Sequence, residues 1–294
     1  MFPFKYLFME KPEFYYKNIM RYKPVIKDNK IDYNIKNYDN IDIFTDYFNE
    51  QERIKAKFIT QEYSPFEYWE MNKEEIIKKF HKDFYEMREY IYKNVKEVSL
   101  FKITTILEII FDLGKNPKKL KILDASAGWG DRLIAFMCLN VNEYIGFDPN
   151  KHLQEGYDEI MKTIKGFNHS ENNYKIFPES FEKCEYENYF DIVFASPPFF
   201  KLEEYEKDNP EQSIIKYSNF KDWKNVFFKN YLNNCIKACK KDGLIYLYIT
   251  NTKNFKIIDF INYQMKNNHV KFVKKIMVGG ASNHYFPLWV WHKI

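Results

Sequence analysis

The chain has 294 residues, enough for one domain of about 200 residues and an extension at one end. Its residues are 45% hydrophobic and 19% aromatic, which excludes a disordered chain because so much apolar surface would collapse. The net charge of +4 is too small to indicate a particular partner by itself.

The N-terminal part of the chain differs in pattern from the rest. Residues 1–60 are polar and rich in tyrosine and show no sustained periodicity, so we expect irregular structure here. We predict that residues 1–114 form an irregular and helical extension. This extension would pack on a catalytic domain formed by residues 115–294.

Two helical patterns precede the catalytic domain. Asn72 followed by Glu75 resembles a capping box, and it predicts an amphipathic helix over 73–94. A second helical pattern over 99–113 ends at Gly114, a residue type that commonly terminates helices. Both helices are expected to serve packing.

From residue 120 onward, apolar strand-length runs alternate with helical patterns, as is typical of parallel βαβ units. Strands are predicted near residues 121–124, 144–148, 174–177, 191–195, 244–250, 272–278 and 288–292. Helices are predicted near residues 131–139, 153–165, 223–240 and 255–266. Gly279 and Gly280 permit a turn between the last two strands. The predicted fold is α/β, Rossmann-like and doubly wound, with a mostly parallel seven-stranded sheet and a C-terminal antiparallel hairpin.

The first strand of this pattern ends in an acid, Asp124, and is followed by a turn of small residues. Gly128 and Gly130 let the backbone approach a ligand, and the next helix presents free N–H groups. Leu133 stands where a dinucleotide motif has its third glycine, which disfavours a dinucleotide. Asp148 ends the next strand, where a carboxylate can accept both ribose hydroxyls. The pattern fits one adenosine with an amino-acid tail.

The run from Asp124 to Asp131, with Asp148, resembles motifs I and II of the class I S-adenosylmethionine-dependent methyltransferases. The resemblance implies S-adenosylmethionine as the cofactor, with Asp148 holding the ribose and Phe181 near the adenine. The residues implied to cradle the methionine moiety are Asp124, Ser126, Ala127, Gly128 and Gly130. Residues 63–69 resemble the segment that closes over the methionine end in some DNA methyltransferases. The alternatives are a tight turn without a ligand and, for Asp148, a strand cap.

The fourth strand of the domain leads into Ser196-Pro197-Pro198-Phe199. Two prolines have fixed φ and no N–H, so the loop is stiff and directs its carbonyls outward. A planar amine has a lone pair delocalised into its ring, and acceptors for its hydrogens localise that pair for attack. We predict that Ser196 Oγ and the Pro197 carbonyl accept these hydrogens while Phe199 stacks on the base.

This loop is identified as a member of the (Asp/Asn/Ser)-Pro-Pro-(Tyr/Phe/Trp) motif IV of amino-group methyltransferases. The resemblance implies catalytic roles for Ser196, Pro197, Pro198 and Phe199, and methyl transfer to adenine N6 or cytosine N4 in DNA or RNA. Serine in place of aspartate or asparagine leaves a neutral acceptor, so both bases remain open. The alternatives are methylation of a protein glutamine amide and a catalytically silent cofactor-binding scaffold.

An insertion over 201–222 follows the motif. It contains six acidic residues and four lysines, a composition that disfavours binding to phosphates. Aromatic residues in and beside the insertion could line a pocket for an extruded base. They are Tyr205, Tyr217, Phe220 and Trp223. A packed surface lid explains the same residues.

Positive charge is concentrated near the C-terminus. Residues 251–294 contain seven lysines and a single acid, Asp259. The two interpretations are a solvated lysine face and a surface that faces nucleic-acid phosphates, with Lys271, Lys274 and Lys275 as candidates.

The sequence indicates no metal site, no hydrolase triad and no membrane segment. The six histidines and four cysteines form no metal-ligand pattern, and no Ser-His-Asp set can be assembled. No leader and no apolar run near 18 residues are visible, so we expect a soluble, intracellular protein with reduced thiols, no membrane and no metal.

Overall fold

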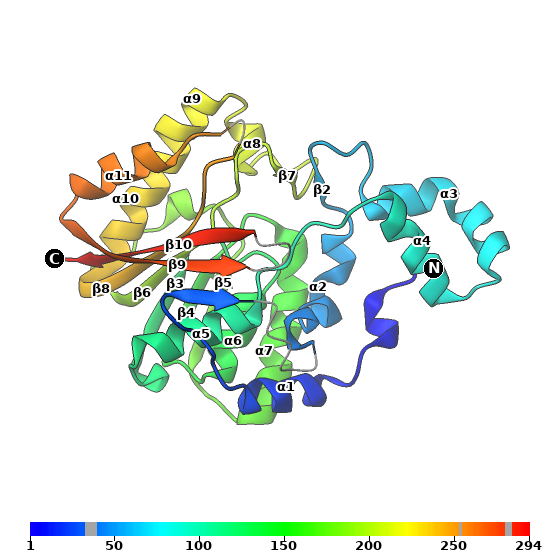
Figure 1. The fold of residues 1–294 in the computed structure, drawn as a ribbon, viewed down its shortest axis with the longest axis horizontal. Coiled ribbons are helices and arrows are strands. Elements are labelled where there is room, and N and C mark those ends of the chain that lie inside the picture. Colours follow the sequence, from blue (N-terminus) through cyan, green and yellow to red (C-terminus); the bar gives the residue numbers. More distant parts are fainter. Residues whose placement is uncertain (33–39, 253–254, 280–283) are drawn as a thin grey trace.

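The computed structural model describes residues 1–32, 40–252, 255–279 and 284–294. Its centre is an eight-stranded sheet with strand order β1-β9-β10-β8-β6-β3-β4-β5 (Figure 1). The strands are β1 (Lys30–Asp32), β3 (Lys121–Asp124), β4 (Glu143–Phe147), β5 (Asn173–Phe177), β6 (Phe190–Ala195), β8 (Cys239–Tyr248), β9 (Val270–Gly279) and β10 (Tyr285–Lys293). Neighbouring strands are parallel except β10, which is antiparallel to β8 and β9. The predicted α/β class and the C-terminal antiparallel hairpin are confirmed.

Helices cover both faces of this sheet. The α-helices are α1 (Pro12–Arg21), α2 (Asp46–Arg53), α3 (Pro65–Phe80), α4 (Phe84–Asn94), α5 (Ile103–Leu113), α6 (Asp131–Cys138), α7 (Gln154–Asn168), α8 (Ser213–Lys216), α9 (Phe220–Asp222), α10 (Lys229–Ala238) and α11 (Ile258–Lys266). The short helices are η1 (Lys5–Phe8), η2 (Ile41–Ile43), η3 (Pro117–Lys119), η4 (Lys151–Leu153), η5 (Phe181–Lys183) and the π-helical η6 (Trp223–Phe228). None of the described helices is long and apolar enough to cross a membrane.

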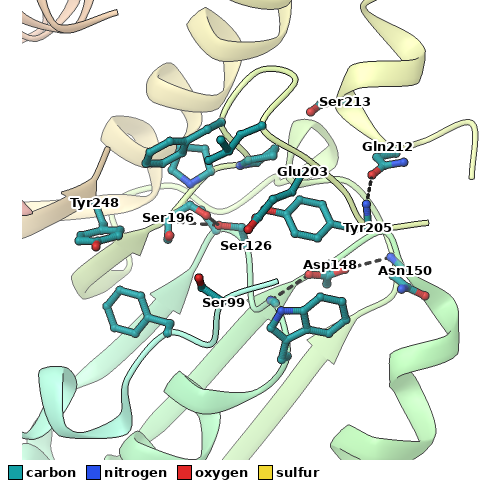
Figure 2. Close-up of a pocket in the computed structure, with 18 of the residues that line it drawn as sticks. Ser99, Ser126, Asp148, Asn150, Ser196, Glu203, Tyr205, Gln212, Ser213 and Tyr248 are labelled. Atoms are coloured by element: carbon teal, nitrogen blue, oxygen red, sulfur yellow. Dashed lines mark hydrogen bonds between the residues drawn. The ribbon is translucent and has the colours of Figure 1, made fainter. Parts of the chain in front are cut away.

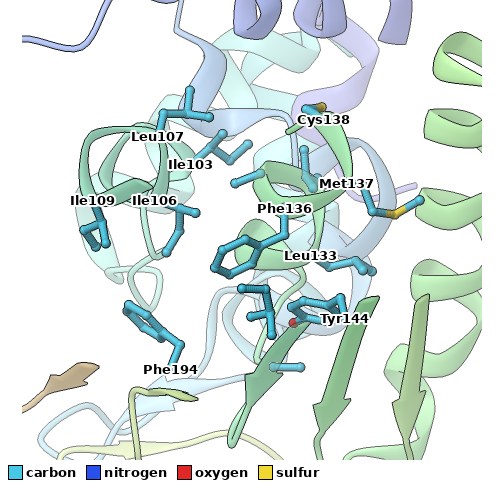
Figure 3. Close-up of a cluster of buried hydrophobic side chains, with 14 of the residues drawn as sticks. Ile103, Ile106, Leu107, Ile109, Leu133, Phe136, Met137, Cys138, Tyr144 and Phe194 are labelled. Atoms are coloured by element: carbon cyan, nitrogen blue, oxygen red, sulfur yellow. The ribbon is translucent and has the colours of Figure 1, made fainter. Parts of the chain in front are cut away.

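The two faces of the sheet carry separate hydrophobic clusters. On one face, α5, α6 and α7 pack over Ile122, Tyr144 and Phe194. Figure 3 shows the α5–α6 part of this layer, with Ile103, Ile106 and Ile109 on α5 and Leu133, Phe136 and Met137 on α6. On the other face, α10 and α11 cover Leu123 and Val193. Because both faces are covered, the accessible part of the sheet is its carboxyl edge, where strands end and loops begin.

The expectation of irregular structure over residues 1–60 is wrong. The segment contains α1, α2 and β1, and β1 adds an eighth strand to the expected seven by pairing in parallel with β9. Tyr15 and Ile19 of α1 and Ile31 of β1 are buried in the main core. These elements are short, so few core positions fall in any one window of sequence, and periodicity did not reveal them.

The single helix predicted over 73–94 is also wrong. His81 and Lys82 take positive φ values of 48° and 66°, and they separate α3 from α4. Asp83 caps the new helix by accepting hydrogen bonds from the N–H groups of Tyr85 (3.0 Å) and Glu86 (3.1 Å).

The capping box lies earlier than the sequence pattern suggested. The Ser64 hydroxyl accepts from the Glu67 N–H (3.1 Å), and the Glu67 carboxylate accepts from the Ser64 N–H (2.8 Å). Pro65 occupies the first helical position, where its missing N–H costs nothing. Residues Asn72 and Glu75 lie inside α3, so they do not start it.

The turn between the closing strands is described only in part. Gly279 has a φ of 147°, and a side chain there would meet the His284 carbonyl oxygen at 2.2 Å. Gly280 lies outside the described residues.

Candidate active site

A cavity of about 700 Å³ opens at the carboxyl edge of the sheet, where β3, β4 and β6 end (Figure 2). We call its lower wall the floor, which consists of the loops that follow these three strands. We call its upper wall the roof, which consists of Phe58 of the short strand β2 (Lys57–Phe58) and residues 202–214. Between them runs a strap, residues 99–102. The predicted site residues that line this cavity are Ser126, Gly128, Asp148, Phe181, Ser196, Pro197, Pro198 and Phe199.

Asp148 lies at the end of β4 and is held by two backbone groups. Its Oδ2 accepts the Gly128 N–H (2.9 Å) and its Oδ1 accepts the Asn150 N–H (3.0 Å). Burial raises the pKa of Asp148 to about 6, and these two hydrogen bonds oppose that shift. A carboxylate oriented in this way can accept further hydrogen bonds from hydroxyl groups in the cavity.

The two glycines of the turn have different functions. Gly128 has a φ of 60° and lines the cavity, where its N–H reaches Asp148. Gly130 has a φ of 102° and precedes α6 without lining the cavity. A Cβ at Gly130 would lie 2.7 Å from Ile160 Cδ1, so this glycine permits α7 to pack closely.

Asp124 is fully buried and lies outside the cavity wall. It accepts hydrogen bonds from Arg132 Nε (2.7 Å), the Tyr144 hydroxyl (2.8 Å) and the Ser126 N–H (3.2 Å). Ala127 is likewise outside the wall and donates its N–H to the Phe147 carbonyl (2.8 Å). Both residues therefore shape the turn from behind.

The Ser126 hydroxyl links the glycine turn to the proline loop after β6. It donates to the Ser196 carbonyl (2.7 Å), accepts from the Ser196 N–H (3.3 Å) and lies 3.1 Å from the Tyr231 hydroxyl of α10. Figure 2 shows Ser126 and Ser196 in contact at the centre of the floor. The two loops are thus fixed relative to each other by one side chain.

The proline loop keeps two acceptors free. Within the part of the chain that the structure describes, neither Ser196 Oγ nor the Pro197 carbonyl has a hydrogen-bond partner. Ser196, Pro197, Pro198 and Phe199 all line the cavity. A planar amino group in the cavity could therefore donate to both acceptors without breaking an existing bond.

Two phenylalanines border the floor. Phe199 stacks on Phe255 with ring centroids 6.2 Å apart and an interplanar angle of 23°. Phe181, at the start of η5, is 3% exposed and packs edge-on against Phe147 and Tyr231.

A further aromatic wall was missed by the sequence analysis. Phe101, Tyr248 and Phe286 line the cavity together with His284. Phe101 and Tyr248 are edge to face at 5.4 Å, and Tyr248 and Phe286 are tilted at 6.3 Å. These residues come from the strap, β8 and β10, so no local sequence motif joins them.

The insertion after the proline loop forms the roof. Its strand β7 (Glu203–Glu204) pairs antiparallel with β2 (Lys57–Phe58), and the Ile59 N–H donates to the Leu202 carbonyl (3.0 Å). Gln212 closes the following turn, because its amide accepts from the Tyr205 N–H (2.7 Å) and donates to the Glu206 carbonyl (2.7 Å). The interpretation as a packed lid fits this arrangement.

The base pocket expected from the four aromatic residues of the insertion does not form as a group. Tyr205 lines the cavity and packs edge-on against Trp129 at 6.0 Å. Tyr217, Phe220 and Trp223 are absent from the wall of the cavity and pack in the α10 core, where Trp223 is fully buried. Phe220 of α9 and Trp223 of η6 stack on each other with ring centroids 6.4 Å apart, and the Tyr217 hydroxyl, just after α8, donates to Glu182.

The N-terminal extension supports the floor from behind. The Thr45 hydroxyl donates to Asp131 (2.6 Å), and the Asn49 amide donates to the Trp129 carbonyl (2.8 Å). Burial raises the pKa of Asp131 to about 7. Residues 63–69, which resembled a cofactor-closing segment, start α3 and do not line the cavity. The strap, residues 99–102, lines the cavity instead.

Of the candidate C-terminal lysines, which all lie on β9, Lys271 is farthest along the strand from the cavity. β9 runs in the direction of the parallel strands, and its last residues, Val278 and Gly279, reach the cavity. Lys271 is seven residues earlier, roughly 23 Å away at about 3.3 Å per residue. Lys274 is paired with Asp112, and Lys275 lies over the Trp289 ring. Lys253, counted in the same charge run, lies outside the described residues.

No protein-family model matches the sequence, and no curated protein matches it. Several solved structures share part of the architecture. A methyltransferase from Pyrococcus furiosus is 16% identical, covers 65% of this chain and 83% of its own, and has a TM-score of 0.42. An S-adenosylmethionine-dependent O-methyltransferase from Thermotoga maritima is 11% identical, with 69% of each chain covered and a TM-score of 0.45. A TehB-like S-adenosylmethionine-dependent methyltransferase from Corynebacterium glutamicum is 12% identical, covers 63% and 86%, and scores 0.42.

Proposed function

We propose that the protein is an S-adenosylmethionine-dependent methyltransferase that modifies an exocyclic amino group of a nucleic-acid base, adenine N6 or cytosine N4, in DNA or RNA. The observation that carries this proposal is the pair of unengaged acceptors, Ser196 Oγ and the Pro197 carbonyl, on the wall of a cavity that also contains Asp148. One cavity thus offers a site for an adenosine and a site for a planar amine.

The cofactor fits the residues of the floor. The Asp148 carboxylate would accept the ribose hydroxyls, and Phe181 would border the adenine. Gly128 brings the backbone close to the ligand because its positive φ needs no side chain. When bound, S-adenosylmethionine supplies an electrophilic methyl group on a sulfonium.

The amine that receives the methyl group is a poor nucleophile, because its nitrogen lone pair is delocalised into the ring. Ser196 Oγ and the Pro197 carbonyl would accept its two hydrogens and draw the nitrogen lone pair out of conjugation. Phe199 would hold the base by stacking, which is worth about 1–3 kcal/mol per base. The prolines and the Ser126 bridge fix these acceptors in advance, and such preorganisation supplies most of the rate where no covalent intermediate forms.

The test is incubation of the protein with methyl-labelled S-adenosylmethionine and separate pools of DNA, RNA and protein. We expect label in a nucleic acid, and nucleoside analysis should locate it on adenine N6 or cytosine N4. Label on glutamine amides would support the protein substrate instead. Cofactor binding without transfer to any pool would support a scaffold, and methyl on a ring carbon or ring nitrogen would remove the amino-transfer mechanism.

A further inference from the structure

The aromatic wall of the cavity begins beside the proline loop and leads away from it across the sheet. In the pairing of β6 with β8, Ala195 lies opposite Leu247. The next residues of these two parallel strands, Ser196 and Tyr248, therefore lie side by side where the strands end (Figure 2). Phe286 of β10 continues the wall, with its ring centroid 6.3 Å from that of Tyr248. The wall thus connects the acceptors of the proline loop with a strand farther out in the sheet.

Phe286 is the exposed end of this wall. Its side chain is 41% exposed although it lines the cavity. Its ring is inclined by 51° to that of Tyr248, so this neighbour does not cover it by stacking. Tyr248 itself packs edge to face against Phe101 at 5.4 Å. Phe286 therefore offers a ring surface to a ligand, and aromatic rings are the surfaces on which unpaired nucleic-acid bases stack.

The spacing between Phe286 and the proline loop fits an extended strand of nucleic acid. Ser196 follows β6 and Phe286 belongs to β10, and β8 lies between these two strands. Neighbouring strands of a sheet are about 4.8 Å apart, so two spacings amount to roughly 10 Å. Consecutive bases along one strand of a duplex are only about 3.4 Å apart. A strand that places one base at Ser196 and the next on Phe286 must therefore be extended, with the two bases unstacked from each other.

The charges of the cavity also favour contacts with bases over contacts with phosphates. Binding to a duplex depends largely on lysines and arginines that neutralise phosphates, whereas binding to a single strand adds stacking on aromatic rings. Among the described residues, the lysine and the arginine of the cavity wall are Lys102 and Arg132, and both are ion-paired with aspartates, at 3.6 Å and 2.7 Å. The roof adds acids to the wall. They are Glu203, Glu206 and Glu211.

We propose that Phe286 is a stacking platform for the nucleotide next to the target base, and that the substrate is therefore single-stranded or locally unpaired nucleic acid. This inference rests on the proposed function, because it names the class of nucleic acid that the same site accepts. Phe199 holds the target base, and Phe286 holds its neighbour. DNA and RNA bases present the same ring faces, so the platform serves either of them.

The experiment compares oligonucleotides that differ in pairing and in the presence of bases. Fluorescence anisotropy measures their binding to the protein in the presence of S-adenosylhomocysteine. The ligands are a mixed-sequence single strand of DNA, the same sequence in RNA, the DNA duplex of that sequence, and an abasic strand of equal length. The variants are Phe286→Ala and Phe286→Trp, which restores an aromatic ring. The matched control is Phe272→Ala, because Phe272 is 50% exposed on β9 but lies outside the cavity wall.

In Phe286→Ala, we expect the affinity for both single strands to fall roughly five- to hundredfold, as for the loss of one stacked base. The affinity of this variant for the abasic strand should not change, and Phe286→Trp and Phe272→Ala should bind the single strands as the unmodified protein does. The unmodified protein should bind a single strand at least about tenfold more tightly than the duplex, because only the single strand stacks on the platform. Tight binding of either DNA or RNA supports the platform, and the tighter of the two identifies the source of the substrate.

Three results would overturn the platform. Equal losses for the single strands and the abasic strand in Phe286→Ala would mean that the ring does not stack on a base. Unchanged binding of the single strands would leave Phe286 without a ligand, even if the protein methylates a nucleic acid. Duplex binding as tight as single-strand binding would exclude the extended substrate. If the unmodified protein neither bound nor methylated any nucleic acid, the proposed function itself would be overturned.

Discussion

The floor and the roof of the cavity are assembled in different ways. The floor comes from consecutive βα units, in which each functional loop directly follows its own strand and is fixed by buried bonds such as Asp124–Arg132. The roof combines β2, the strap and residues 202–214, which are far apart in the sequence and meet through the two-residue pair β2–β7. The floor is therefore held by many buried bonds between adjacent segments, and the roof by few contacts between distant ones.

The largest effect is expected at the floor. Ser196→Ala removes one acceptor and leaves the Pro197 carbonyl, so turnover should fall by about a hundred- to a thousandfold, or about 2.7–4 kcal/mol, with cofactor binding intact. Single-turnover kinetics measures this. The control is Ser180→Ala, because Ser180 lines the same cavity and its hydroxyl, among the described residues, donates only to Glu182 (3.1 Å). Full activity in Ser196→Ala would contradict the mechanism.

The next effect in size is expected on cofactor binding, when Asp148 of the floor is replaced. Asp148→Ala leaves ribose hydroxyls unpaired, and affinity for S-adenosylhomocysteine should weaken by about 1–3 kcal/mol in calorimetry. The carboxylate accepts hydrogen bonds only when it is ionised, and burial raises its pKa to about 6. Affinity should therefore be full at higher pH and fall as the pH drops through about 6. Asp158→Ala on the outer side of α7 is the control, and pH-independent binding would exclude the Asp148 assignment.

Gln212 tests the roof. Gln212→Ala removes two hydrogen bonds of 2.7 Å and should loosen residues 203–212 by about 1–3 kcal/mol, with little change in the melting temperature of the whole chain. Hydrogen exchange of the roof should accelerate, and cofactor affinity should fall several-fold. The matched control is Gln51→Ala, which alters an exposed glutamine of α2. If the free energy of unfolding of the whole chain fell by as much as that of residues 203–212, the roof and the floor would unfold together.

The smallest effect is expected at the far end of the sheet. Replacing Lys271 by glutamine should leave turnover within about twofold, because roughly 23 Å of strand separates Lys271 from the cavity. Affinity for nucleic acid and its salt dependence, measured by titration at several salt concentrations, report any phosphate contact at this face. Lys162→Gln is the control. A strong loss of affinity with a shallower salt slope would mean that the nucleic acid reaches around to this end.

The sequence predicted correctly those elements that are formed by a few consecutive residues. The strands β3, β4 and β6 were predicted within one or two residues, because a buried strand is a short apolar run bounded by turn residues. Asp148 and the Ser196–Phe199 loop followed from these positions, since whatever follows a parallel strand lies at the carboxyl edge. The start of α3 was not predicted: its capping box lies at Ser64 and Glu67, and Trp69 and Ile76 of this helix are buried in a cluster with Phe2.

The sequence by itself therefore determined the class of fold, the edge of the sheet where the cavity lies, and most of the floor residues that line it. Only the tertiary structure decided that Asp124 supports the turn from behind, that Thr45 and Asn49 hold it in place, and that Ser99 and Glu203 meet over the cavity. The physical reason is that a turn or a strand end is specified by backbone preferences of adjacent residues. The partners of a buried carboxylate or a two-residue strand are specified by packing between segments that the sequence separates widely.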